Sequence, residues 1–89
     1  MGASRTVEVL NKRGLHARAS ARFVTLASTL PVEVLVENDG SSVCGTSIMG
    51  LMMLGAAMGD RITISADGDG AEEAVTALAE LVEGKFGED

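Results

Sequence analysis

The stretch TVEVLNKRGLHARASARFVTLASTLP, residues 6–31, changes its hydrophobic period once, and this change decides the fold class. Thr6–Leu10 alternates polar and apolar residues, which is the pattern of a half-buried β-strand. Asn11–Gly14 has the composition of a turn. From Leu15 the apolar residues recur three or four positions apart, which predicts an amphipathic helix that ends before Pro31, because a residue that precedes proline disfavours the α conformation. The apolar face of this helix is formed by Ala19, Phe23, Leu26, Ala27 and Leu30.

Three further strands are predicted after this helix. Val32–Val36 and Ser42–Cys44 are joined by Asn38-Asp39-Gly40, a strong signal for a hairpin turn. Arg61–Ala66 alternates between polar and apolar residues and forms the fourth strand.

Two shorter signals predict the remaining helices. Ile48–Leu54 is apolar, with Ser47 as a good N-cap and Gly55 as a good terminator. For the last helix we expect Asp69 to be the N-cap and Glu72 its capping-box partner. The apolar face of that helix is formed by Val75, Leu78, Leu81 and Val82.

The predicted order β-α-β-β-α-β-α belongs to the α+β class. It is typical of a two-layer sandwich of four strands and three helices, with the sheet on one side and the helices on the other. The chain has 89 residues, of which 46% are hydrophobic, enough to build one core. We therefore expect a single domain over residues 1–89. Phe23 and Phe86 are the only aromatic residues, so the core is built mainly from aliphatic side chains.

The composition excludes several classes of protein. A chain with a net charge of −6 and two aromatic residues lacks the positive charge and the stacking surfaces of nucleic-acid-binding proteins. Cys44 is the only cysteine, which excludes an intrachain disulfide and a cysteine metal cluster. The most apolar stretch, Ile48–Met58, is about half a membrane span, and the first residues lack the apolar run of a signal peptide. We expect a cytoplasmic protein with no metal and no membrane insertion.

The charges are distributed unevenly along the sequence. Much of the negative charge lies in the segment Glu72–Asp89, at the end of the chain. The cations near His16, the only histidine, are Lys12, Arg13, Arg18 and Arg22. The sequence therefore predicts a local positive region around His16.

His16 stands where the first helix is predicted to begin. A helix N-terminus presents unpaired N–H groups and a partial positive charge, and these together bind anions. Arg18 and Arg22 occupy the first two turns, where acidic residues are normally favoured, which suggests that an anion binds there. The imidazole of histidine supplies a neutral nitrogen nucleophile, so a phosphoryl group on His16 would be held by N–H donors and by Arg18 without a metal. The alternative is that His16 is a capping or surface residue.

Gly14-Leu15-His16-Ala17-Arg18-Ala19, followed by Ala21, Phe23 and Val24, resembles the active-site segment of the HPr family. These proteins are the histidine phosphocarriers of the bacterial phosphotransferase system. A second matching segment, Gly45–Leu51, lies about thirty residues further on, and the resemblance covers essentially the whole chain. It implies an open-faced sandwich, in which a four-stranded antiparallel sheet is covered on one face by three helices. It also implies a carrier rather than an enzyme, with no cofactor. It also implies that His16 accepts the phosphoryl group on Nδ1 from a phosphohistidine of enzyme I, is assisted by Arg18, and passes the group to an enzyme IIA domain.

One residue departs from the pattern of many sugar-branch members. Ala19 stands where they have proline, which the first helical turn tolerates because its missing N–H has no partner there. Together with Met49, Met52 and Met53, the segment is more similar to the nitrogen-branch carriers, called NPr, or to the single carrier of α-proteobacteria. The resemblance therefore leaves open whether the acceptor is a sugar-type or a nitrogen-regulatory IIA.

Ser47 has two readings. Its predicted place as an N-cap is a sufficient structural explanation. By resemblance it also matches the serine that HPr kinase/phosphorylase modifies in some bacteria, and a phosphate at a helix N-terminus is electrostatically compatible with the fold.

The helix Ile48–Leu54 is apolar almost all round, so it cannot bury every face. We expect Ile48, Leu51, Met52 and Leu54 to face the sheet and Met49 or Met53 to be exposed, although core filling would also explain these methionines. Methionine adapts to different partners, which suits a monomeric carrier that binds donor and acceptor in turn. The predicted docking residues are Arg22, Ile48, Met49, Leu51, Met52 and Met53.

Two other classes compete with the carrier. An acyl carrier protein is also small and acidic with a serine at a helix start, but that family is all-helical and has Asp before the serine, where this chain has Thr46. A non-enzymatic regulatory or ligand-binding module could share the same two-layer fold.

Overall fold

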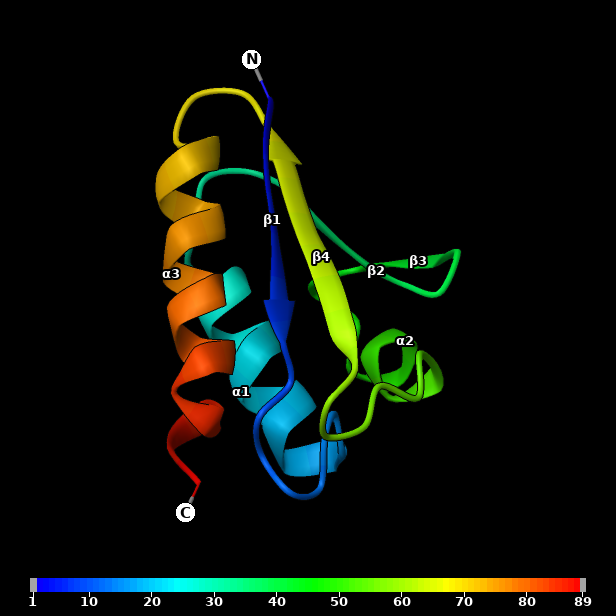
Figure 1. Cartoon of the computed structure of the whole chain (residues 1–89). Helices are drawn as coiled ribbons and strands as arrows, with labels where there is room; N and C mark the ends of the chain where they lie inside the picture. Colours follow the sequence, from blue (N-terminus) through cyan, green and yellow to red (C-terminus); the bar gives the residue numbers. More distant parts are fainter. Residues whose placement is uncertain (1, 89) are drawn as a thin grey trace.

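The computed structural model of the chain describes residues 2–88, which form four β-strands, three α-helices and one short 3-10 helix (Figure 1). In chain order these elements are β1 (Gly2–Glu8), α1 (Ala17–Ala27), β2 (Val34–Asn38), β3 (Ser41–Cys44), α2 (Ile48–Met53), β4 (Arg61–Asp67), α3 (Ala71–Glu83) and η1 (Lys85–Gly87). Within these residues no helix is both long enough and apolar enough to cross a membrane.

The four strands form one antiparallel sheet in the order β1-β4-β2-β3. β1 pairs with β4 from Gly2 opposite Asp67 to Glu8 opposite Arg61. In Figure 1 α3 lies to the left of β1, and α1 lies behind the strands. α3 packs on β1 and β4, and α2 packs against α1 and β3. The predicted open-faced sandwich is thereby confirmed.

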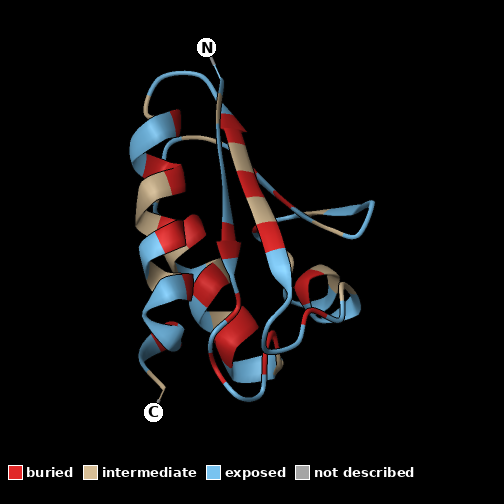
Figure 2. Ribbon diagram, viewed as in Figure 1, coloured by how far each residue is buried: buried red, intermediate tan, exposed pale blue. Residues whose placement is uncertain are grey.

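Burial alternates along the central strand β4, as the sequence pattern predicts (Figure 2). Ile62, Ile64 and Ala66 are buried, whereas Thr63 and Ser65 between them are half-buried. The buried side of the sheet meets the apolar faces of α1 and α3, which include Ala19, Phe23, Val75, Leu78 and Val82.

Both phenylalanines are completely buried, and they hold different parts of the chain. Phe23 belongs to α1 and Phe86 to η1, the short turn that follows α3. Burial of a large apolar side chain contributes about 1.5–3 kcal/mol. Phe86 therefore anchors the C-terminal segment to the core.

Several element boundaries differ from those predicted. β1 begins at Gly2 rather than Thr6, because pairing with β4 needs only backbone groups and does not require alternating side chains. β2 begins at Val34 rather than Val32, after the bend at Pro31.

The predicted cap of the last helix is wrong. Gly70, not Asp69, is the N-cap of α3, and no side chain caps the helix, so Glu72 has no capping-box partner. Gly70 has φ of 89°, the left-handed region that favours glycine, and a Cβ there would lie 3.0 Å from the Pro31 Cγ. The close approach of Pro31 selects glycine at this turn, and the helix begins one residue later than the capping pattern suggests.

Candidate functional site

His16 is the N-cap of α1, and the loop before it is held firmly against its neighbours. Leu15 is buried, its N–H donates to the Ala56 carbonyl at 3.0 Å, and its carbonyl accepts from the Ser20 hydroxyl at 3.1 Å. Gly14 has φ of 62° and packs on the backbone of residues 56 and 57. These contacts fix the position from which His16 projects.

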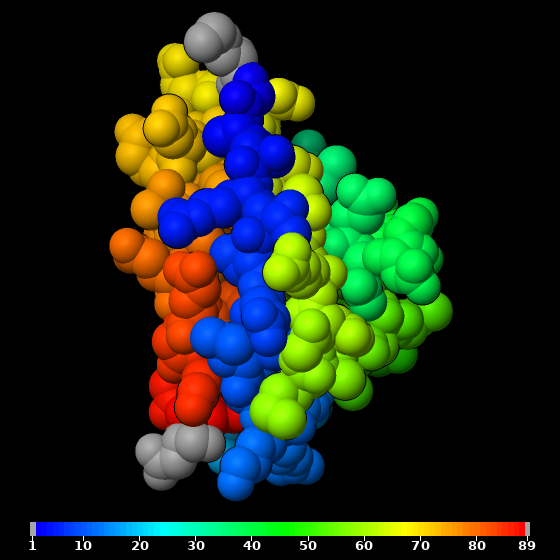
Figure 3. Space-filling view, in the orientation of Figure 1, coloured from blue at the N-terminus to red at the C-terminus, as the bar shows by residue number. Residues whose placement is uncertain are grey.

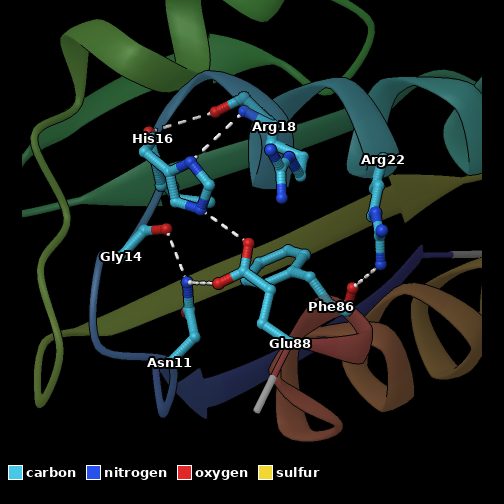
Figure 4. Close-up of polar contacts among 9 residues, drawn as sticks. Asn11, Gly14, His16, Arg18, Arg22, Phe86 and Glu88 are labelled. Carbon is cyan, nitrogen blue, oxygen red and sulfur yellow. Dashed lines mark hydrogen bonds and ion pairs between the residues drawn. The ribbon is translucent and has the colours of Figure 1, made fainter.

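The two ring nitrogens of His16 have different surroundings (Figure 4). Nδ1 accepts a long hydrogen bond, 3.3 Å, from the backbone N–H of Arg18 in the first turn of α1. Nε2 lies 2.6 Å from Oε2 of Glu88, and the two side chains are 16% and 18% exposed. A carboxylate accepts hydrogen bonds, so this contact places the ring proton on Nε2 and leaves the Nδ1 lone pair at the helix N-terminus.

Glu88 is the residue of the site that sequence reasoning missed. It belongs to the negative C-terminal segment and contacts His16, 72 residues away in the sequence. In Figure 1 and Figure 3 the C-terminal segment and the loop before α1 both lie at the lower end of the molecule. No local pattern could have predicted this contact, because it depends on the burial of Phe86 two residues earlier.

Asn11 is the second missed residue. It is fully buried, and its Nδ2 donates to the Gly14 carbonyl at 2.8 Å and to Oε1 of Glu88 at 3.1 Å (Figure 4). Burial raises the pKa of the Glu88 carboxyl, but hydrogen bonds from Asn11 and His16 and the charges of His16 and Arg22 outweigh it. The net effect holds that pKa below its ordinary value of 4.5, so Glu88 is ionised at neutral pH.

Arg18 and Arg22, two of the arginines predicted near His16, lie on α1 and are exposed. Figure 4 shows the Arg18 side chain beside the imidazole ring. The guanidinium of Arg22 donates to the Phe86 carbonyl, so this predicted docking residue also holds the C-terminal segment in place.

The predicted docking helix shows four exposed apolar side chains and one buried one. Leu51 is fully buried, which corrects its assignment as a docking residue, because a side chain in the core cannot contact a partner. Ile48 and Met52 were expected to pack on the sheet, but both are exposed, because a helix of six residues covers too little of the sheet to bury them. The exposed fractions are 40% for Ile48, 69% for Met49, 41% for Met52 and 79% for Met53.

Two exposed apolar residues in loops were not predicted. Leu10 is 37% exposed and Met58 is 57% exposed. They lie in two loops that are joined by backbone hydrogen bonds. Val9 bonds to residues 59 and 60, and Leu15 bonds to Ala56. Both loops lie next to the segment that carries His16. The period of a strand or helix cannot reveal such residues, because they lie in loops.

Ser47 caps α2 as predicted. Its hydroxyl accepts from the Gly50 N–H at 2.9 Å, and its backbone is extended, as at most N-caps. The structure therefore gives Ser47 a complete structural role.

Comparisons with known proteins agree along nearly the whole chain. A family model described as "PTS HPr component phosphorylation site" matches residues 3–84. Phosphocarrier protein HPr of Neisseria meningitidis serogroup A is 51% identical over 83 residues, which cover 93% of each chain. Phosphocarrier protein NPr of Shewanella violacea is 38% identical over 84 residues, which cover 94% of this chain and 92% of the relative. The crystal structure of HPr-C-His from Thermoanaerobacter tengcongensis matches with a TM-score of 0.92 and 47% identity over 98% of both chains.

Proposed function

The chain belongs to the HPr family of phosphocarrier proteins, and on this premise we propose that His16 is the residue that carries the phosphoryl group. Family members are carriers in the phosphotransferase system rather than catalysts. The observation that supports His16 most strongly is that its two ring nitrogens have different partners. Nε2 is engaged by Glu88, while Nδ1 lies at the N-terminus of α1, where N–H groups and the helix dipole favour an anion.

The site supports the transfer of a phosphoryl group between two nitrogens by positioning and charge stabilisation. The Arg18 N–H now donates weakly to Nδ1 and is the nearest donor for a phosphoryl oxygen on that atom. The Arg18 guanidinium beside the ring supplies a positive charge without a metal or cofactor.

Intact-mass measurement after incubation with phosphoenolpyruvate and enzyme I tests the proposal. We expect the gain of one phosphate that is labile in acid and stable in base, and NMR coupling between phosphorus and nitrogen should place it on Nδ1. Failure to accept phosphate from any cognate enzyme I would refute the carrier function of His16.

Replacement of Arg18 by alanine should slow transfer from enzyme I by about 10- to 100-fold, which corresponds to the loss of one charge-assisted hydrogen bond. Alanine favours the helix and Arg18 is exposed, so the free energy of unfolding should change little. Rapid-quench assays measure the rate of phosphoryl transfer from enzyme I. Arg13→Ala removes the same charge from the loop and serves as the control. Equal rates in the two variants would show that Arg18 does not contact the phosphoryl group.

Enzyme I and an enzyme IIA are the donor and acceptor that we propose, with the IIA of either the sugar type or the nitrogen-regulatory type. Ala19 in place of proline and the methionines of α2 favour the nitrogen type, whereas the HPr of Neisseria meningitidis is more similar to this chain, at 51% identity, than the NPr, at 38%. Incubation of the phosphorylated protein with equal amounts of a nitrogen-type and a sugar-type IIA tests this, since the preferred acceptor gains phosphate first. The expected cytoplasmic location and monomeric state remain predictions.

The exposed residues Ile48, Met49, Met52 and Met53 form the surface that we propose for partner docking. Replacement of Met53 by glutamate should weaken binding of enzyme I by about 10-fold, because it places a charge in an apolar contact. Titration calorimetry measures this. Leu35→Glu is the matched control, since Leu35 is an exposed apolar residue on the sheet and the change adds the same charge. The proposal is wrong if both variants bind every partner as the unmodified protein does.

Phosphorylation of Ser47 by a kinase is a further part of the proposal, and its effect would be electrostatic. Ser47→Asp should slow phosphorylation of His16 by enzyme I several-fold, because the added charge opposes an acidic partner. Ser47→Asn is the control, because asparagine is an equally good N-cap without the charge. If the aspartate and asparagine variants react equally fast, charge at this position has no regulatory effect. Incubation of the protein with purified kinase and ATP, followed by intact-mass measurement, tests whether the serine is a substrate.

A further inference from the structure

Glu88 and Asn11 form a chain of hydrogen bonds that ends on the ring of His16 (Figure 4). One carboxylate oxygen of Glu88 faces Nε2 and the other accepts from Asn11. Both oxygens are therefore used, and the carboxylate cannot rotate without breaking one of the two bonds. This arrangement resembles other sites in which a carboxylate sets the tautomer and the orientation of a histidine.

The orientation of the Asn11 amide is determined by its neighbours. Nδ2 faces two acceptors, the Gly14 carbonyl and Oε1 of Glu88, so a rotated amide would direct its oxygen at two oxygens. In the observed orientation Oδ1 is buried without a partner. An unpaired buried acceptor costs about 1–3 kcal/mol, and the two bonds of Nδ2 oppose this cost. The bond to Gly14 supports the loop before α1, and the bond to Glu88 holds the carboxylate that faces His16.

The C-terminal turn delivers Glu88 at some conformational cost. Lys85 and Phe86 have φ of 60° and 55°, in the left-handed region that non-glycine residues rarely adopt. The turn is held by the buried ring of Phe86 and by the bond from Arg22 to the Phe86 carbonyl. The strained backbone reverses the chain and brings Glu88 back to His16.

We propose that Asn11 and Glu88 are positioning residues for phosphoryl transfer. Asn11 holds the Glu88 carboxylate against Nε2, so that the ring proton stays on Nε2 and Nδ1 keeps its lone pair for the incoming group. This inference rests on the proposed role of His16 as the phosphoryl acceptor.

The carboxylate also stabilises the charge that the reaction creates. The lone pair of Nδ1 forms the new N–P bond, and the N–P bond of the phosphohistidine donor breaks with its electron pair remaining on the donor nitrogen. The Nε2 proton stays in place, so the His16 ring becomes positively charged as the phosphoryl group arrives. Glu88, 2.6 Å from Nε2, stabilises this charge. Loss of that proton later leaves a neutral phosphorylated ring.

The experiment compares Glu88→Gln and Glu88→Ala with the unmodified chain. Because His16 is the only histidine, nitrogen-15 NMR of the ring reports its tautomer without further assignment. The unmodified ring in its neutral form should be mainly the Nε2–H tautomer. Glu88→Gln keeps one acceptor oxygen but replaces the other by an NH2 donor, which cannot accept from Asn11, so it should weaken the tautomer preference and slow transfer from enzyme I, because the charge is lost. Glu88→Ala should give a mixture of tautomers and slow transfer by about 10-fold or more.

Two further variants complete the test. Glu80→Gln removes an equivalent charge from an exposed position on α3 and should change neither the tautomer nor the rate. Asn11→Leu should weaken the tautomer preference. If it fails to fold, the Glu88 variants decide the question alone. The proposal is overturned if Glu88→Ala leaves the tautomer or the transfer rate unchanged, or if transfer becomes faster, which would make Glu88 an obstacle to partners. The tautomer is measured without phosphate, so its result stands even if His16 proves not to be the acceptor.

Discussion

Replacement of His16 by alanine is expected to abolish the gain of phosphate from enzyme I completely. No other histidine is present in the chain, so no second imidazole can take the group. Intact-mass measurement under the conditions that fully phosphorylate the unmodified chain checks this. A remaining phosphate of the same acid-labile kind would show that the phosphoryl group is carried elsewhere.

The alanine variant also loses an N-cap, and this must be separated from the chemistry. Removal of a capping side chain costs about 1 kcal/mol, which a domain of this size tolerates. His16→Asn is the matched control, because asparagine is a strong N-cap but not a phosphoryl acceptor. We expect both variants to fold, and neither to gain phosphate. Phosphorylation of the asparagine variant would contradict the role of His16.

Replacement of Gly14 by alanine is expected to lower the free energy of unfolding by about 3 kcal/mol, the largest effect on stability that we predict. Gly14 has φ of 62°, and a Cβ there would collide with the Ala56 carbonyl oxygen and lie 2.8 Å from the Ala57 Cα. These are backbone atoms, so the loop must move to relieve the contact. The movement breaks the bond from Leu15 to Ala56 and displaces His16, so transfer should slow as well. Urea denaturation measures the stability.

Gly55→Ala separates the steric collision of the added Cβ from the cost of the left-handed backbone conformation. Gly55 has φ of 68°, close to that of Gly14, but a Cβ there would meet nothing within 4 Å. This control should therefore lose only about 1 kcal/mol, the cost of the left-handed conformation reduced by the lower entropy of the unfolded chain. Equal losses in the two variants would mean that the loop adapts freely and that Gly14 does not fix the position of His16.

Much of the fold could be predicted because its signals are local. The alternation in β4, the period of α1 and the cap of α2 by Ser47 each involve residues within one element, and each is present in the structure. The misplaced cap of α3 shows where such reasoning ends. Gly70 is required there by its contact with Pro31, and these residues meet only when the sheet and helices are assembled.

The residues of the candidate site also divide into those that local sequence signals predict and those that they do not. His16 and Arg18 were found because both belong to one helix start, where backbone N–H groups and side chains are neighbours in the sequence. Asn11 and Glu88 were not found, since they lie 77 positions apart and meet only through the buried turn at Phe86. The exposure of the residues of α2 was predicted in part, because the period of a short apolar helix does not show which face the core covers. Leu51 is on that covered face.

The sequence by itself determined the order of the elements, the single histidine and the positive charges that flank it. It did so because strand and helix periods, caps and turns are properties of neighbouring residues. Only the tertiary structure decided the electrostatics of His16. The core buries Phe86, the turn after it reverses, and a carboxylate from the acidic C-terminal segment enters the positive region. Residues 6–31 thus provide the histidine and the helix N-terminus beside it. Glu88, at the far end of the chain, engages Nε2 and so leaves the lone pair of Nδ1 facing that helix.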